Sequence, residues 1–188
     1  MQHSITAAVA ASSAYPHVEI GPKFNDADEL MQPEGFRTWV CLGVPLTPNS
    51  LNNGAAGFPE YHNVNVELAA YQHYLEHGEW PEGTMMVKAL QLTRAGRFDD
   101  GSTTEASGRG YFPAIPNGLD VSVKDSSRFR DTRSRGFFNF GRHAPPYAPV
   151  AEAAPKEAGA GCHMASVHED MVFSDFYQQL QPLATGSR

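Results

Sequence analysis

Five short segments of β-branched, aromatic and other apolar residues dominate this sequence, and stretches rich in Gly, Pro and Asn separate them. The segments cover residues 36–44, 62–66, 84–92, 119–123 and 136–141. In one of them His62, Val64 and Val66 alternate with two asparagines, which is the period of a strand with one buried face. Pro and Gly at the segment ends indicate turns. The sequence therefore predicts a sheet of about five strands.

Helical spacing is found in three places. Residues 26–31 are acidic and follow Asn25, a suitable N-cap, and residues 66–77 have one apolar side and end at Gly78. Residues 163–180 carry a broad apolar stripe. The remaining long segments are predicted to be irregular, and they cover residues 45–60, 94–110 and 142–161. The predicted fold class is α+β, an antiparallel sheet that carries a few helices.

The composition is that of a soluble globular protein with a single domain, since 188 residues include 41% hydrophobic and 19% charged residues. Asp and Glu outnumber Lys and Arg by 21 to 14. The resulting net charge of -7 argues against a nucleic-acid partner, because phosphate contacts need a basic surface. No apolar run approaches the ~20 residues of a membrane-spanning helix. We therefore expect neither nucleic acid nor a membrane as a partner.

The start of the chain differs from the rest in composition. Residues 1–14 are small and weakly apolar, and they lack the basic start and continuous apolar core of a signal peptide. We expect a flexible lead over residues 1–24, one domain over 25–183 and a tail over 184–188. The lead fits either a cytoplasmic chain or the mature form of an exported protein whose leader has been removed.

The dipeptide Cys162-His163 opens the last predicted helix, directly after Gly-Ala-Gly. A cysteine followed by a histidine ends the C-x-x-C-H motif of c-type haem attachment, in which the thiols bond to the haem vinyl groups and the histidine binds iron. Gly159 stands at the first cysteine position of that motif. On spacing alone, haem attachment and an ordinary core thiol both remain open.

Three further residues are candidates for chemistry. His62, on an apolar strand face, is either a core histidine with satisfied hydrogen bonds or a metal ligand or proton donor, because neutral imidazole suits Zn, Cu and Fe. Lys88 shares its strand face with Met86 and Leu90, and Arg37 lies on the first strand. Either stem could instead cover the core while the charge reaches water. The sequence has no P-loop, G-x-G-x-x-G or G-x-S-x-G motif, so nucleotide binding and serine-hydrolase chemistry have no support.

Several motifs occur in a recognisable order. They are Phe36-Arg37-Thr38-Trp39, Phe58-Pro59-Glu60-Tyr61-His62, Trp80-Pro81-Glu82-Gly83-Thr84, Val123-Lys124-Asp125, Phe137-Phe138-Asn139-Phe140-Gly141 and Cys162-His163. In this order the sequence resembles the cytochrome P-460 family, across roughly residues 30–183. The resemblance implies a curved antiparallel sheet of about five strands packed with helices, a homodimer and a periplasmic or secreted location.

The resemblance also implies a c-type haem. Cys162 would be the second attachment cysteine and His163 the proximal iron ligand. His62, Arg37 and Lys88 become candidates for the other side of the pocket, with Arg37 and Lys88 in catalytic roles. Some members of the family carry a lysine–haem cross-link and oxidise hydroxylamine, whereas relatives of the cytochrome c′-beta kind bind nitric oxide.

Gly159 departs from the family pattern and removes one of the two thioether positions. Two cofactor states follow. In the first, haem remains on Cys162 and His163. In the second, haem is absent, and Cys41 and Cys162 either form a disulfide or join His62 and His163 around a single transition metal. Nitrogen and sulfur ligands favour copper or zinc over magnesium or calcium.

Of these states we favour the haem-free, copper-type site, with zinc as the second choice of metal. The predicted function is that of an exported redox metalloprotein, an oxidoreductase that oxidises or binds a small molecule between the sheet and the last helix. One alternative is a c-type haem protein, attached through a single thioether, that oxidises hydroxylamine or binds nitric oxide. The other is a non-catalytic binding module with a Cys41–Cys162 disulfide.

Overall fold

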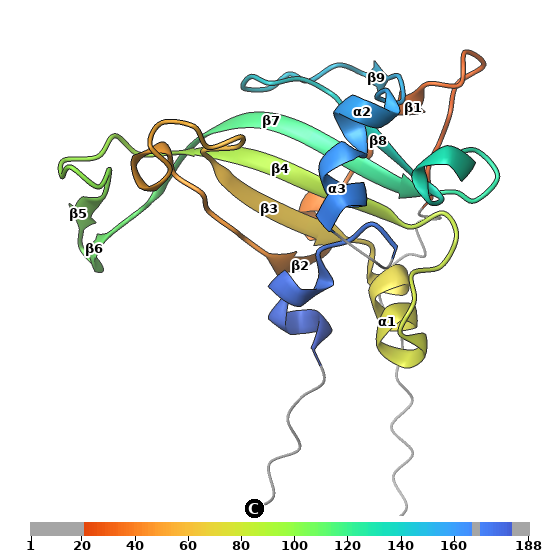
Figure 1. Cartoon of the computed structure of the whole chain (residues 1–188), viewed down its shortest axis with the longest axis horizontal. Helices are drawn as coiled ribbons and strands as arrows, with labels where there is room; N and C mark the ends of the chain where they lie inside the picture. Colours follow the sequence, from red (N-terminus) through yellow and green to blue (C-terminus); the bar gives the residue numbers. More distant parts are fainter. Residues whose placement is uncertain (1–20, 167–169, 182–188) are drawn as a thin grey trace, which may run out of the picture.

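The computed structural model describes residues 21–166 and 170–181, and it has an α+β fold built around a five-stranded antiparallel sheet (Figure 1). The strand order is β2-β3-β4-β7-β8. These strands are β2 (Val40–Gly43), β3 (Tyr61–Val66), β4 (Met85–Thr93), β7 (Pro113–Lys124) and β8 (Arg135–Asn139). The predicted fold class and sheet are therefore confirmed. None of the helices in the described ranges is long and apolar enough to cross a membrane.

The strand register decides which side chains share a face. Residues directly opposite each other in an antiparallel pair point to the same side of the sheet. His62 pairs with Leu90, Val64 with Lys88, and Lys88 in turn with Asp120. The register thus places His62, Lys88 and Asp120 on one face, although they come from three different strands.

The two faces of the sheet carry separate apolar cores. One core contains buried residues of β4, β7 and β8, which pack against Leu30 and Ala151 of the small sheet formed by β1 (Leu30–Met31) and β9 (Val150–Ala151). The other core joins β2, β3 and β4 to the C-terminal residues Val172, Tyr177 and Leu180. The second face is the one that bears His62 and Lys88.

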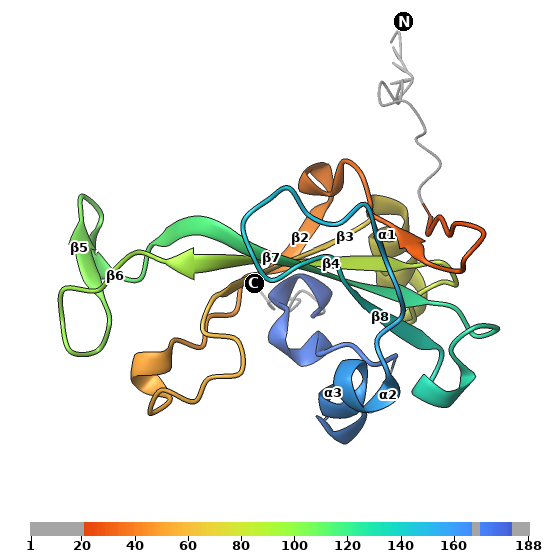
Figure 2. The same ribbon diagram turned by 90° about the horizontal axis from the view of Figure 1, so that it is seen from above.

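The helices are short. The longest is α1 (Leu68–His77), which lies within the predicted range of 66–77 and ends at Gly78, whose φ is 76°. The two C-terminal helices are α2 (Lys156–Gly159) and α3 (Gly161–Ser166). The 3-10 turns are η1 (Phe36–Thr38), η2 (Asn49–Leu51), η3 (Arg130–Thr132), η4 (Ser174–Phe176) and η5 (Gln178–Leu180). In Figure 2 the β2–β3 loop, α2, α3 and the last two turns lie on the same side of the sheet.

The prediction of a long helix over residues 163–180 is wrong. The helix α3 ends at Ser166, residues 167–169 lie outside the described part of the chain, and Asp170 and Met171 have φ values of 47° and 57°. Such left-handed residues cannot continue a right-handed helix. Part of the apolar stripe is nevertheless buried, because turns and extended segments bury Met171, Tyr177 and Leu180.

Two other predictions differ from the structure. In place of the helix predicted over residues 26–31, residues 26–29 form a turn, in which the Asn25 carboxamide oxygen accepts hydrogen bonds from the amides of Ala27 and Glu29, and Leu30 and Met31 form β1. This local bonding by asparagine competes with a helix. The predicted loop at 94–110 contains a hairpin of β5 (Thr103–Glu105) and β6 (Gly108–Gly110).

The predicted lead and tail fall mostly outside the described residues. Residues 1–20 and 182–188 are not described. At the other end of the predicted lead, Phe24 forms a bridge to Leu30 and an edge-to-face contact with Phe138. The ordered packing therefore includes Phe24, one residue before the predicted start of the domain.

Candidate functional site

His163 lies on α3 and faces the sheet, half-buried between two aromatic rings. Its ring centroid is 4.7 Å from that of Phe137 on β8 and 4.8 Å from that of Phe173. Its Nδ1 is 2.6 Å from the carbonyl oxygen of Met171. Because a carbonyl only accepts hydrogen bonds, Nδ1 must carry the proton, and the lone pair is left on Nε2. Nε2 has no hydrogen-bond partner among the described residues.

The environment of His163 keeps its imidazole neutral. Burial lowers its pKa, the hydrogen bond to Met171 raises it, and the charges of Lys88 and Arg135 lower it further. A neutral imidazole whose Nδ1–H donates to a carbonyl is the usual state of a histidine that binds a metal through Nε2. The geometry of His163 is therefore compatible with binding a metal through Nε2.

A cluster of charged and aromatic side chains lies on the same sheet face. The Asp120 carboxylate on β7 is 2.9 Å from the Lys88 ammonium and 3.2 Å from the Arg142 guanidinium. Both cations also lie over the Phe58 ring, at 3.9 Å and 4.5 Å from its centroid. We call Phe58, His62, Lys88, Asp120 and Arg142 the Asp120 cluster. Its carboxylate holds two cations against one aromatic ring.

His62 belongs to this cluster and contacts Phe58 in two ways. Its Nε2 is 3.1 Å from the Phe58 carbonyl oxygen, and its ring makes an edge-to-face contact with the Phe58 ring at 5.7 Å. Burial is the main cause that lowers its pKa; the Phe58 hydrogen bond raises it and Lys88 lowers it. The sequence predicts that His62 is either a core histidine with satisfied hydrogen bonds or a metal ligand or proton donor. Its hydrogen bond to Phe58 favours the core histidine.

The ligand set predicted from Cys41, His62 and His163 is not assembled. Cys41 is a free, exposed cysteine on β2, where it pairs with Asn65, and strand alternation puts it on the face opposite His62. Over the described ranges, no three or more His, Cys, Asp or Glu residues form a group that could hold a metal ion. The described structure thus does not bring Cys41, His62 and His163 together, and the Cys41 thiol is free.

Arg37 is also apart from this face. It lies on η1, is exposed, and places its guanidinium 5.4 Å from the centroid of the Phe36 ring. Phe36 belongs to the core on the other face of the sheet. The predicted pairing of Arg37 with Lys88 around one pocket is thus not seen, whereas Lys88 and His163 act on each other electrostatically.

Gly159 ends α2 at a point of close packing. A Cβ atom at this position would lie 2.9 Å from the Cβ of Ala154 and 3.1 Å from the Cβ of Phe137. Real Cβ atoms essentially never come as close as the first of these contacts. The chain therefore has no room for a cysteine at the first position of the haem-attachment motif, unless the α2 segment moves. Attachment through Cys162 alone agrees with this packing.

Sequence reasoning missed several residues of this face. Asp120 lies between Leu119 and Val121 in a predicted strand, so alternation predicts that it is on the polar face of that strand. Only the β4–β7 register, which sets Asp120 opposite Lys88, reveals the cluster. Phe173 lies within the helix predicted over 163–180, and the turn that brings it against His163 carries no sequence signal.

A comparison with protein-family models finds a match to the model described as Cytochrome P460 over residues 33–174, which is most of the chain. The matched range includes both Cys162 and His163. No curated protein sequence matches the chain. The resemblance found in the sequence is thus confirmed. The chain belongs to the cytochrome P460 family, whose members are haem-binding redox proteins.

Proposed function

We propose that this protein is a haem-binding redox protein that binds or oxidises a small nitrogen compound, either hydroxylamine or nitric oxide. Cys162 would hold the haem through a single thioether, and Nε2 of His163 would be the proximal ligand. The observation that carries the proposal is the 2.6 Å hydrogen bond from His163 Nδ1 to the Met171 carbonyl. It leaves Nε2 as the lone-pair donor, as a proximal ligand requires.

The residues present fit a haem with one covalent link. The Cys162 thiol can add across one vinyl group, which forms an S–C bond and transfers the thiol hydrogen to the neighbouring carbon. The crowded Gly159 position excludes the second link. Phe137 and Phe173 keep water from the ligand histidine on both sides. When bound, the haem would supply an iron that binds the small molecule and exchanges electrons.

The Asp120 cluster would act on the bound small molecule through charge and proton transfer. Lys88 and Arg142 provide positive charge, and Asp120 holds both on one side of the sheet. His62 has a pKa below its usual range, so it stays neutral near pH 7 and can accept a proton. This cluster, rather than the exposed Arg37, is the proposed second half of the site.

The copper-type site that the sequence favoured has no support in the structure, because its ligands are not brought together. Expression in a host with haem-attachment machinery separates the two accounts. The haem proposal predicts an intense Soret band in the wild type, and a changed or lost band in His163→Ala. His62→Ala is the matched control and should retain haem. A colourless wild type that contains copper would contradict the proposal.

We also propose a periplasmic or secreted location and a homodimer, on the basis of the family resemblance. Fractionation of an expressing cell and light scattering of the purified protein test the two parts separately. Recovery of haem-loaded protein only from the cytoplasm, or as a monomer, would contradict them.

A further inference from the structure

The chain makes a strained turn directly before Val172 and Phe173, and the Phe173 ring packs against His163. Asp170 and Met171 both have positive φ, at 47° and 57°, and neither is a glycine. Non-glycine residues in this region are uncommon, and such conformations persist only where the surroundings hold them. The turn directs the Met171 carbonyl toward Nδ1 of His163. Whatever holds the turn therefore also holds the histidine.

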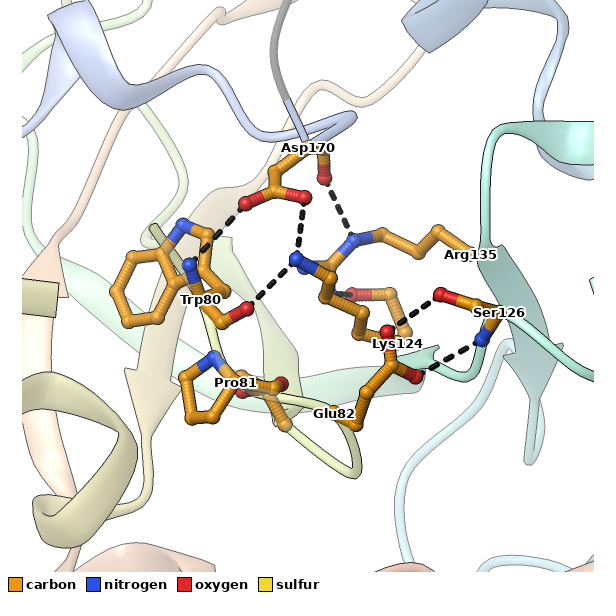
Figure 3. A network of polar contacts seen from close by, with 9 residues as sticks. Trp80, Pro81, Glu82, Lys124, Ser126, Arg135 and Asp170 are labelled. Carbon is orange, nitrogen blue, oxygen red and sulfur yellow. Dashed lines mark hydrogen bonds and ion pairs between the residues drawn. The ribbon is translucent and has the colours of Figure 1, made fainter. Parts of the chain in front are cut away.

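Three residues hold the turn through their contacts with Asp170 (Figure 3). The Arg135 Nε donates to the Asp170 carbonyl oxygen at 2.7 Å. The Lys124 ammonium is 2.7 Å from one carboxylate oxygen of Asp170, and the Trp80 amide donates to the other at 3.1 Å. Lys124 also donates to the Trp80 carbonyl at 2.6 Å. We call Trp80, Lys124, Arg135 and Asp170 the Asp170 network.

Arg135 is placed here at a cost to folding. Its side chain is 1% exposed, and its Nη2 finds no hydrogen-bond partner among the described residues. Burial lowers its pKa to about 10, so the guanidinium remains charged near neutral pH. A buried cation with an unpaired N–H is unfavourable for stability alone, and an apolar residue of similar size would pack without that cost.

We infer that the Asp170 network positions the proximal histidine: Arg135 and Lys124 hold Asp170, the strained turn holds the Met171 carbonyl, and that carbonyl fixes the ring and tautomer of His163. These are positioning residues, because none of them contacts His163 directly in a hydrogen bond. Their effect on a bound haem rests on the proposed function. Their effect on the histidine does not, because the hydrogen bond joins His163 to Met171 of the chain itself.

The first experiment uses the haem-free chain and Lys124→Met, which removes one cation from the network. Nitrogen NMR of His163 reports which ring nitrogen carries the proton and how fast that proton exchanges with water. The inference predicts mixed tautomers and an exchange about tenfold faster than in the wild type, as expected when one hydrogen bond loses its support. Lys124→Arg should restore the wild-type signal. An unchanged tautomer and exchange rate in folded Lys124→Met would overturn the inference.

Matched variants guard against a general loss of structure. Arg94→Gln removes the cation of an exposed pair with Glu105 and should leave His163 as in the wild type. Asp170→Asn keeps the size of the side chain and removes its charge, so it should act as Lys124→Met does if the latter does not fold. If Arg94→Gln changes the His163 signal as much as the network variants do, the effect is general and the inference fails.

The haem-loaded protein gives the second readout. The inference predicts that Lys124→Met shifts the reduction potential and the ferric spectrum relative to Lys124→Arg, because the ligand histidine loses its fixed hydrogen bond. If the wild type takes up no haem, the proposed function fails, while the NMR result still decides on the positioning. If haem binds and the potentials of the two variants are equal, the positioning does not reach the iron and this part is overturned.

Discussion

At the scale of single residues, the site depends on which nitrogen or sulfur atoms can still bind a metal or cofactor after their neighbours have formed hydrogen bonds and packed. The Met171 carbonyl settles the tautomer of His163, and Gly159 packs so closely against Ala154 and Phe137 that a larger side chain has no room there. Cys162 and His163 could be found from their spacing in the sequence. Asp120 could not, because only the strand register shows that it faces Lys88.

Substitution of Gly159 by cysteine restores the C-x-x-C-H motif, but we expect the crowded position to disfavour a second thioether link. Gly159→Cys places a Cβ atom 2.9 Å from that of Ala154, so we expect a loss of about 1–3 kcal/mol, the usual cost of overpacking. Thermal unfolding of the haem-free protein measures this. Gly161→Ala is the control, since nothing lies within 4 Å of the added Cβ atom. A variant as stable as the wild type, with two thioethers, would contradict the packing argument.

The pKa of His62 reports on the Asp120 cluster. The Asp120 carboxylate raises this pKa and the Lys88 ammonium lowers it. Asp120→Asn should therefore lower the pKa of His62, and Lys88→Met should raise it, by a few tenths to about one unit. Proton NMR titration of the haem-free protein measures both shifts, with the exposed Asp99→Asn as a control. Shifts of the same sign in both variants would rule out the cluster as described.

Glu67 makes stability depend on pH. It is 4% exposed, its Oε1 has no partner among the described residues, and burial raises its pKa from 4.5 to about 7. The native state thus keeps a proton that the unfolded chain has lost, and stability falls as the pH rises from about 4.5 to about 7. Below 4.5 both states are protonated, so this penalty is absent there.

Glu67→Gln should remove that dependence. We expect the variant to gain about 1–3 kcal/mol over the wild type at pH 8, the cost of burying an unpaired charge, and little at pH 4.5. Chemical unfolding at both pH values measures the difference. Glu76→Gln, exposed on the same helix, is the control. An equal effect of Glu67→Gln at both pH values would show that Glu67 is not the titrating group.

At the scale of elements, the sheet was predictable and the C-terminal segment was not. The strands at 62–66, 84–92 and 119–123 have clear alternation, and the structure forms β3, β4 and β7 over them. The helix predicted at 163–180 fails because its apolar spacing fits a helix and a series of turns equally well. The turn at Asp170 is held by Arg135 and Lys124 from distant strands, which no local pattern reveals.

The C-terminal turns pack against β2, β3 and β4, and one of their contacts with the edge strand β2 is especially close. The Tyr177 ring lies against Gly43 of β2, where an added Cβ atom would be 2.8 Å from a ring carbon. Gly43→Val should displace η5 and cost about 1–3 kcal/mol, as for other overpacked sites. Unfolding and hydrogen exchange of residues 177–180 measure this, with Gly57→Ala, in open space, as the control. Unchanged exchange at Leu180 would show that this contact does not hold the turns.

At the scale of the whole molecule, the chain places the two halves of the proposed site, His163 and the Asp120 cluster, on one side of a single sheet. His163 comes from α3 and the Asp120 cluster from the strands and loops beneath, while the opposite face is filled by an apolar core. The family and fold could be predicted from the order of motifs. The position of Cys41 could not, because only the β2–β3 register shows that it lies on the face opposite His62.

The central claim is that a single haem is held covalently by Cys162 with His163 as its ligand. Mass spectrometry under denaturing conditions, on protein made in a haem-attachment host, tests it most directly. The account predicts one haem retained on the peptide that contains Cys162, a pyridine haemochrome band between those of unlinked and doubly linked haem, and loss of covalent haem in Cys162→Ala but not in Cys41→Ser. Protein that releases all its haem on denaturation, or keeps it in Cys162→Ala, would contradict the account.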